Sequence, residues 1–142
     1  MKPKILLRMA SIIMFLHDVG HTFGSLSWKQ TSDPEKQQII NQMIGHKFPF
    51  MGAIRSMGDT IDGYGYATIL SLFFFSAILW ILAGSLTQNP KLARKLLITV
   101  SAILLVWGIN ELIFFFPFAA SFSLIAMILT VIAIFRMNVE SN

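Results

Sequence analysis

The sequence predicts an all-α integral membrane protein, a four-helix bundle with a helical, partly re-entrant outer loop between its first two spans. Hydrophobic residues make up 55% of the 142 residues and charged residues only 13%. Four apolar segments each approach the roughly 20 residues that cross a bilayer. A chain with this much apolar surface cannot hide it in a water-soluble core, so we expect a single transmembrane domain over residues 1–142.

The predicted spans cover approximately residues 5–26, 64–86, 96–116 and 118–135. Pro117 separates the last two with almost no polar linker, which predicts a tight antiparallel hairpin. The basic start and the following apolar run suggest a signal peptide, but Arg8 interrupts the run and no small-x-small cleavage site precedes His17. We therefore expect the first segment to be a retained span.

The positions of the basic residues predict the orientation. Most Lys and Arg residues fall on one side of the four-span topology: Lys2, Lys4, Arg8, Lys91, Arg94, Lys95 and Arg136. The others are spread over the longer loop of residues 27–63: Lys29, Lys36, Lys47 and Arg55. Because cytoplasmic loops carry the excess of Lys and Arg, both termini should be cytoplasmic, residues 27–63 extracytoplasmic, and the host membrane the bacterial cytoplasmic (inner) membrane.

Ionisable residues inside two predicted spans indicate a site. His17 and His21 lie one helical turn apart with Asp18 beside them, and each such group costs roughly 2.5–3.5 kcal/mol at a helix centre. Both the first and third spans run outward. At 1.5 Å per residue His21 and His17 lie about 7 Å and 14 Å below the outer end of their span, and Glu111 about 8 Å below the end of its own. We therefore expect these groups to share one layer in the outer half of the membrane.

Helical geometry places small residues beside these polar groups. His17 and His21 share one stripe of the first span with Ala10, Gly20, Gly24 and Ser25. Gly20 and Gly24 predict close approach of a neighbouring helix. On the third span, Glu111 lies on one face with Leu104, Trp107 and Gly108.

The outer loop should contain a short helix followed by an irregular segment. Ser32-Asp33-Pro34-Glu35 is a helix start and Gly45 a stop, which predicts a helix from about Pro34 to Ile44. Residues 46–52 are too apolar for a free loop and too broken for a span. We expect this stretch to fold back over the outer mouth and bring four side chains near the intramembrane groups: His46, Arg55, Asp59 and Asp62.

Several chemistries fit these groups. The hypothesis of a divalent metal site uses His17, His21, Asp18 and Glu111. Haem is less favoured, because a single chain offers no clear opposing transmembrane histidine. A small-ligand site would use His46, Arg55, Asp59, Asp62, Asn110 and Trp107. A proton relay is a further alternative, and so is a non-catalytic accessory or assembly subunit whose polar groups only join helices.

Composition excludes other classes. The chain has no cysteine, which rules out thiolate metal sites, iron–sulfur clusters and dithiol redox chemistry. It has no phosphate loop and nothing that suggests nucleic acid. No nucleophile identifies a reaction, so the sequence leaves enzymatic activity open. The expected partners are the lipid bilayer and either a second copy, as a homodimer, or a larger membrane complex.

Two stretches carry a family resemblance. They are His-Asp-Val-Gly-His-Thr-Phe-Gly at residues 17–24 and Phe-Pro-Phe-Met-Gly-Ala-Ile-Arg-Ser-Met-Gly-Asp at residues 48–59. With the chain length, they resemble a family of small four-span bacterial membrane proteins that has no established activity. The resemblance covers most of the chain and implies the four-span architecture, but it assigns no catalytic residue.

Overall fold

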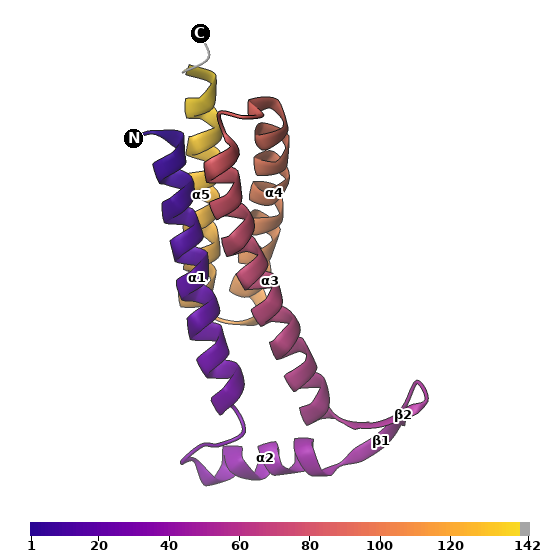
Figure 1. The fold of residues 1–142 in the computed structure, drawn as a ribbon. Coiled ribbons are helices and arrows are strands. Elements are labelled where there is room, and N and C mark those ends of the chain that lie inside the picture. Colours follow the sequence, from indigo (N-terminus) through magenta and orange to yellow (C-terminus); the bar gives the residue numbers. More distant parts are fainter. Residues whose placement is uncertain (140–142) are drawn as a thin grey trace. The chain divides into compact units, whose positions relative to one another are not determined.

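The computed structural model describes residues 1–139, in which five helices and one β-hairpin follow one another along the chain (Figure 1). The elements are α1 (Pro3–Ser27), α2 (Pro34–Gly45), β1 (Lys47–Phe50), β2 (Ala53–Ser56), α3 (Met57–Ser85), α4 (Pro90–Phe114) and α5 (Pro117–Val139). The predicted helical character is confirmed. The four-span bundle and the re-entrant loop are not confirmed: among the described residues, three helices are long and apolar enough to cross a membrane, namely α3, α4 and residues Pro117–Met137 of α5.

The chain divides into two compact units, although the sequence predicts one domain. Unit 1 contains Met1–Asp18 and the described residues from Leu72 onward, and unit 2 contains Val19–Ser71. The division passes through α1 and α3, so each of these helices contributes to both units. Unit 1 is entirely helical, whereas unit 2 combines helical segments with the hairpin.

An apolar core holds the four helical segments of unit 1 together. Leu7, Leu79, Leu97 and Leu104 are fully buried, and Ala126 joins them from α5. Burial of each such side chain contributes about 1.5–3 kcal/mol in water, whereas packing and interhelical hydrogen bonds take over this role inside a bilayer.

Two buried serines join α1 to α3 within unit 1. The Ser11 hydroxyl donates to the Ser76 carbonyl oxygen over 2.7 Å, and the Ser76 hydroxyl donates to the Ser11 carbonyl oxygen over 3.0 Å. Each small side chain thus reaches the other helix's backbone. Such reciprocal contacts require the two backbones to approach closely, which small residues permit in membrane helices.

The predicted hairpin between the last two helices is confirmed. α4 ends at Phe114 and α5 begins at Pro117, where proline suits the first turn. At the other end of α4, the Asn89 side chain accepts a hydrogen bond from Leu92 N, and Pro90 follows this cap. α4 and α5 pack closely at Gly108, where an added Cβ would lie 2.7 Å from Leu124 Cδ2.

Within this chain, the described residues show no close helix approach at Gly20 or Gly24, where the sequence predicts one. A Cβ added at either position would meet no atom within 4 Å. In unit 2 the close approach lies instead at Gly65, where a Cβ would come 3.1 Å from Ser25 Oγ. Small-residue spacing permits an approach but does not require one, since the partner must also present a matching surface.

The predicted short helix in the outer loop is confirmed as α2. Asp33 caps it by accepting from the backbone N of Glu35 and Lys36, and Pro34 occupies the first turn. The helix ends at Gly45, one residue beyond the predicted boundary. Its last turn packs against the start of α3, where an added Cβ on Gly58 would lie 2.9 Å from Ile44 Cγ1.

The β-hairpin is the element that the all-α prediction missed. β1 and β2 pair antiparallel, with Phe48 opposite Arg55 and Phe50 opposite Ala53. Met51 and Gly52 form the two-residue turn, and both have positive φ, at 47° and 84°. Positive φ at both central residues matches the right-handed twist of hairpin strands. Pro49 is compatible with β1 because both strands are sheet edges.

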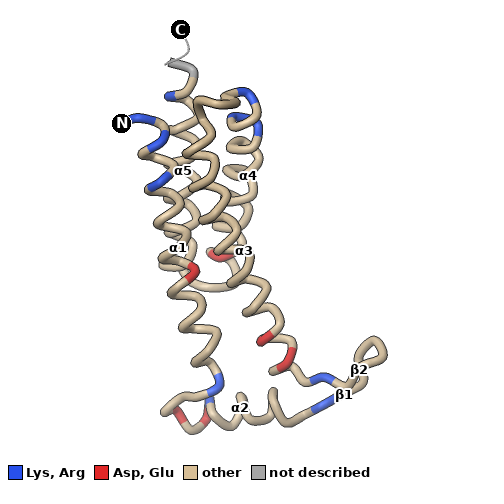
Figure 2. Tube along the Cα trace, viewed as in Figure 1, with Lys and Arg blue, Asp and Glu red and all other residues tan. Residues whose placement is uncertain are grey.

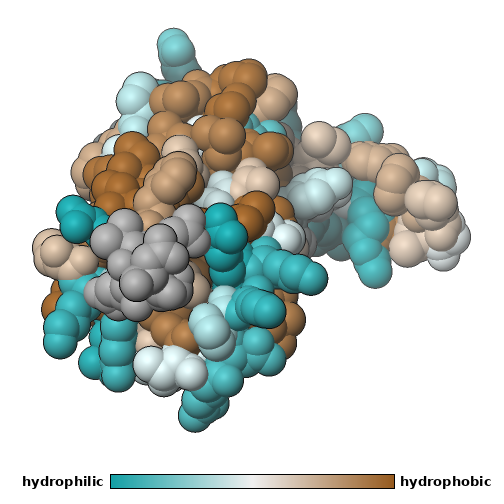
Figure 3. Space-filling view, turned by 90° about the horizontal axis from the view of Figure 1, so that it is seen from above, coloured by the Kyte–Doolittle hydropathy of each residue, from teal (hydrophilic) through white to brown (hydrophobic). Residues whose placement is uncertain are grey.

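Charged residues are distributed unevenly in unit 1. Figure 2 shows the basic residues gathered at the end that carries the N-terminus and the start of α4, while acidic residues lie farther along the helices. Figure 3 looks onto this end and shows hydrophilic side chains there, with apolar side chains on neighbouring surfaces. Arg8 lies over the Trp80 ring with its Cζ 4.8 Å from the ring centroid. This contact accommodates a charge in the first predicted span.

Candidate functional site

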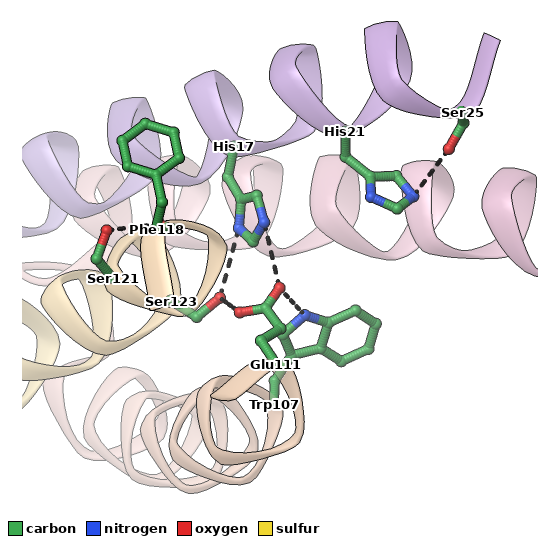
Figure 4. Close-up of polar contacts among 8 residues, drawn as sticks. All are labelled: His17, His21, Ser25, Trp107, Glu111, Phe118, Ser121 and Ser123. Atoms are coloured by element: carbon green, nitrogen blue, oxygen red, sulfur yellow. Dashed lines mark hydrogen bonds and ion pairs between the residues drawn. The ribbon is translucent and has the colours of Figure 1, made fainter. Parts of the chain in front are cut away.

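The centre of the candidate site is a contact between His17 of α1 and Glu111 of α4, both in unit 1 (Figure 4). His17 Nε2 lies 3.2 Å from Glu111 Oε1. Their side chains are only 6% and 7% exposed. The structure therefore brings together two residues that the sequence assigned to one membrane layer.

Two further side chains complete what we call the polar cluster: His17, Trp107, Glu111 and Ser123. Trp107 Nε1 donates to Glu111 Oε1 over 2.9 Å, and the Ser123 hydroxyl donates to Glu111 Oε2 over 2.7 Å. Ser123 Oγ also lies 3.4 Å from His17 Nδ1. Both carboxyl oxygens of Glu111 thus have donors from this chain, as a buried carboxyl group requires.

Helix geometry explains why these residues meet. Trp107 and Glu111 are four residues apart on α4 and so lie on one face. The approach of α5 at Gly108 places Ser123, the neighbour of Leu124, opposite that face. Aromatic rings flank the cluster: His17 stacks on Phe122 at a centroid distance of 5.4 Å, and Trp107 meets Phe75 edge-on at 5.7 Å.

The contacts of the cluster require a proton between His17 and Glu111. The Ser123 hydroxyl donates to Glu111 Oε2, and the direction of the 3.4 Å contact between Ser123 Oγ and His17 Nδ1 depends on the tautomer of the imidazole. The 3.2 Å contact between Nε2 and Oε1 needs a proton, carried by the imidazole or by the carboxyl group. Three states of the pair meet this requirement: an imidazolium with a carboxylate, a neutral imidazole with a carboxylate, and a neutral imidazole with a carboxylic acid.

The predicted metal ligands divide between the two units. His17, Asp18 and Glu111 belong to unit 1, where all three are buried, and His21 belongs to unit 2. Among residues 1–139, no group of three or more His, Cys, Asp and Glu side chains is arranged to hold a metal ion. Metal binding therefore stays a prediction from the sequence.

The remaining residues that the sequence assigns to the predicted spans have separate surroundings. His21 Nε2 lies 3.1 Å from Ser25 Oγ, one turn along α1. Asn110 is exposed, on a different face of α4 from buried Glu111. Trp107 therefore joins the cluster, while its predicted companion Asn110 points elsewhere.

The predicted ligand residues of the outer loop all lie in unit 2, where most have contacts that shape the local fold. The backbone N–H of His46 donates to Gln42 O at the end of α2, and Arg55 donates to the carbonyl oxygen of Ile54. Asp59 accepts from Ser56 N over 2.8 Å, while its own N–H donates to Ser56 Oγ over 3.1 Å. This reciprocal capping box starts α3.

Asp62 connects the end of α1 to the start of α3 within unit 2. It accepts from Trp28 Nε1 over 2.9 Å and from Lys29 Nζ over 2.5 Å. The Asp62 carboxylate raises the pKa of Lys29 above its ordinary value, chiefly through this hydrogen bond. Lys29 remains exposed, so solvent screens the interaction.

Sequence reasoning missed Ser123, the residue that completes the cluster. It lies in the most apolar predicted span, and nothing in its spacing distinguishes it from other hydroxyl residues nearby. Comparisons with protein-family models, with curated proteins and with solved structures found no match. Functional inference therefore depends on the geometry of the cluster.

Proposed function

We propose that this chain is a four-span protein of the bacterial cytoplasmic membrane whose His17–Glu111 pair binds a proton inside the membrane, as a component of a proton relay or of proton-coupled transport. The observation that carries this proposal is the buried 3.2 Å contact between His17 Nε2 and Glu111 Oε1, which requires a proton on one of the two atoms. Histidine and carboxylate groups are the usual proton carriers of membrane proteins. Histidine also changes charge closest to neutral pH.

Support for α1 as the fourth span comes from its exposed face. Its exposed large apolar residues recur every three or four positions: Ile5, Met9, Ile12, Leu16, Val19 and Phe23. This spacing makes an apolar stripe along one side of a helix. The opposite side carries buried Ser11, His17 and Asp18. A helix that faces lipid has this arrangement, with apolar side chains directed outward and polar side chains directed inward.

The orientation proposed for the chain keeps both termini in the cytoplasm. It is supported by the basic residues gathered at one end of unit 1 (Figure 2), where α1 and α4 begin and α5 ends; Lys4, Arg94 and Arg136 lie near these three helix ends. Cytoplasmic segments near spans carry this excess of positive charge. The polar cluster belongs to the other part of the unit, beyond most of these charges, as expected for a site in the outer half of the membrane.

A proton is favoured over a divalent metal by the donors around the pair. Ser123 and Trp107 present hydrogen-bond donors to Glu111, whereas a metal ion needs electron pairs from several ligands. The indole N–H is a donor only and cannot coordinate a metal. Its hydrogen bond to Oε1 instead stabilises negative charge on Glu111 when the proton moves to His17.

The test is a histidine titration followed by ¹⁵N NMR in lipid nanodiscs. The chain has three histidines, and His17→Asn identifies the His17 signals. We expect the His17 nitrogen shifts to change with pH in a transition that Glu111→Gln alters, because the two groups titrate as one pair. His46, exposed at the end of α2, is the internal control that Glu111→Gln should leave unchanged.

Two results would contradict this proposal. His17 nitrogen shifts that stay constant across the stable pH range would show that the pair does not exchange its proton. A His17 transition that is identical in wild type and Glu111→Gln would show that the two residues do not share one. A second variant, Asn110→Ala, controls for general perturbation of α4, because Asn110 precedes Glu111 and is exposed.

The second candidate function is that of a non-catalytic accessory or assembly subunit, as a homodimer or within a larger complex. It is favoured by the satisfaction of both Glu111 oxygens by this chain's own donors. A cluster of this kind can serve only to join α1, α4 and α5. In that case Glu111→Gln should weaken folding while the wild-type His17 shifts stay insensitive to pH.

A further inference from the structure

The tip of the β-hairpin in unit 2 exposes a concentrated group of apolar side chains. Met51 is 92% exposed, Ile54 67% and Phe50 58%. These residues occupy the turn and the strand ends beside it. Single exposed apolar residues are ordinary, but a group at the end of a projecting hairpin indicates an interaction surface.

The backbone of the turn gives a second and independent observation. Met51 has φ of 47°, in the left-handed region that L side chains adopt rarely, and Gly52 follows at 84°. The first position of such a turn ordinarily holds Asn, Asp or Gly. A methionine there lowers the local preference for the turn, and it gains no buried contact in return. Local rules are commonly broken where a residue serves function.

The charged residues beside the tip indicate what kind of partner it contacts. Lys47 and Arg55 are exposed on the two strands, and the hairpin from Lys47 to Ser56 contains no acidic residue. An apolar tip with flanking basic side chains is the pattern of a segment that enters a membrane interface, with its cations among anionic headgroups. Apolar side chains such as those of Met51 and Phe50 partition into that layer, and its anionic headgroups already match the two cations. A protein partner would have to supply acidic groups for the same purpose.

The connection to α3 keeps the hairpin close to lipid. β2 ends at Ser56 and α3 begins at Met57, without a linker. α3 has 29 residues, so it is about 43 Å long. This exceeds the roughly 30 Å hydrocarbon core and matches the roughly 40–45 Å of a bilayer with its headgroups, so the start of a spanning α3 reaches the headgroup layer. A segment joined directly to a spanning helix experiences a high effective concentration of bilayer surface.

We propose that the hairpin tip, Phe50, Met51 and Ile54, inserts into the interfacial layer of the bilayer that the chain spans, with Lys47 and Arg55 at anionic headgroups. The tip is thus a lipid anchor in a part of the chain that the proton-binding pair does not use. This proposal rests on the membrane location given in the proposed function but not on the proton-binding pair, since its residues belong to unit 2 and the polar cluster to unit 1.

Spin labelling tests this insertion directly, because the cysteine-free chain accepts a single label at a chosen site. Met51→Cys carries a nitroxide in vesicles of phosphatidylcholine with phosphatidylglycerol. We expect collisions with oxygen, which dissolves in lipid, to exceed those with a water-soluble nickel chelate. Gln38→Cys on α2 is the control, since Gln38 is polar and exposed and should favour the nickel chelate.

Two results would overturn the proposal. Nickel accessibility at position 51 equal to that of the Gln38→Cys control would place the tip in water. Spin–spin broadening at position 51 that disappears on dilution with unlabelled protein would identify a second copy as the partner instead. Repeating the measurement with Ile54→Cys protects the test against a local disturbance of the turn by the label.

Met51→Asn separates anchoring from folding. Asn-Gly is the preferred sequence for this turn, so amide exchange of β1 and β2 should stay as slow or become slower. A nitroxide at Ile54→Cys in the same chain should nevertheless gain nickel accessibility severalfold, because the largest apolar side chain of the turn is lost. Unchanged accessibility would show that Met51 does not anchor the tip.

The two basic residues are tested with Lys47→Gln and Arg55→Gln in one chain. In the wild-type background, the protection of a label at position 51 from the nickel chelate should increase with the phosphatidylglycerol content of the vesicles. The double variant should lose this increase, and an increase that is retained would contradict the headgroup contact.

Discussion

The two units each contain a contact between a basic and an acidic side chain, but the contacts have different surroundings. In unit 1 the side chains of His17 and Glu111 are 6% and 7% exposed, whereas in unit 2 those of Lys29 and Asp62 are 46% and 23% exposed. An exposed pair is weakened by solvent and salt. A buried pair costs much more when one partner is lost, because the other remains desolvated. Similar contacts therefore have different roles: the His17–Glu111 contact stabilises the interior of unit 1, whereas the Lys29–Asp62 contact contributes weakly at the surface of unit 2.

The largest effect is expected for Glu111→Ala. It leaves the Trp107 N–H and the Ser123 hydroxyl without their acceptor and removes the carboxyl group that contacts His17 Nε2, and breaking a buried pair costs about 3–5 kcal/mol. The free energy of unfolding in detergent micelles measures the loss. Asn110→Ala is the matched control, expected within about 0.5 kcal/mol of wild type. Equal stability of the two variants would remove the distinction between the units.

Gly108→Ala should give the next largest effect in unit 1. Its Cβ would lie 2.7 Å from Leu124 Cδ2 and 2.8 Å from Leu124 Cγ, so the Leu124 side chain or the two helices must shift. Overpacking of this kind costs about 1–3 kcal/mol. Gly84→Ala on α3 is the control, since a Cβ there meets no described atom within 4 Å and alanine favours helix. Restoration of stability by an added Leu124→Ala substitution would locate the clash, and a failure to restore it would argue against this packing.

In unit 2, Ser56→Ala should destabilise the start of α3 by about 1 kcal/mol, because the capping box with Asp59 loses one of its two hydrogen bonds. Amide exchange in the first turn of α3 is the measurement. Ser71→Ala is the control, since the Ser71 hydroxyl bonds only its own helix at Ala67 O. Exchange that is equally fast in both variants would contradict the assigned cap.

The smallest effect concerns Lys29 and pH. Its folded-state pKa is raised by the hydrogen bond to Asp62, so this stabilisation is complete below the ordinary value of 10.5 and is lost as pH rises through the folded value. Asp62→Asn should return the pKa of Lys29 toward that ordinary value, as measured by NMR of the Lys29 side chain. High salt should act in the same direction. A pKa that neither change affects would show that the pair does not persist in solution.

The sequence predicted the helices well because their signals are local. Pro34 after Asp33 marks the start of α2, and length with apolar composition marks the long helices. The second and third spans were predicted to begin at residues 64 and 96, whereas α3 begins at Met57 and α4 at Pro90, because a helix can extend beyond its apolar segment. The capping contact between Ser56 and Asp59 begins α3 before the predicted span.

The hairpin and the polar cluster were harder to predict for physical reasons. A methionine in the left-handed region opposes the usual turn preference, so Met51-Gly52 gave a weak hairpin signal. Ser123 could not be distinguished from Thr130, whose hydroxyl bonds its own helix at Ala126 O. Hydroxyl residues in apolar helices commonly make such bonds. The Ser123 hydroxyl donates to Glu111 instead, because α4 packs closely against α5 at this position.

The reciprocal bonds between Ser11 and Ser76 have a consequence for insertions and deletions. They fix the axial register of α1 against α3 at a point six residues before His17. One extra residue between Ser11 and His17 would turn the imidazole about 100° around the helix, away from Glu111, while the serine contact stayed in place. Length changes in this short interval should therefore be rejected during evolution, although conservative substitutions at its exposed positions, Ile12 and Leu16, should be accepted.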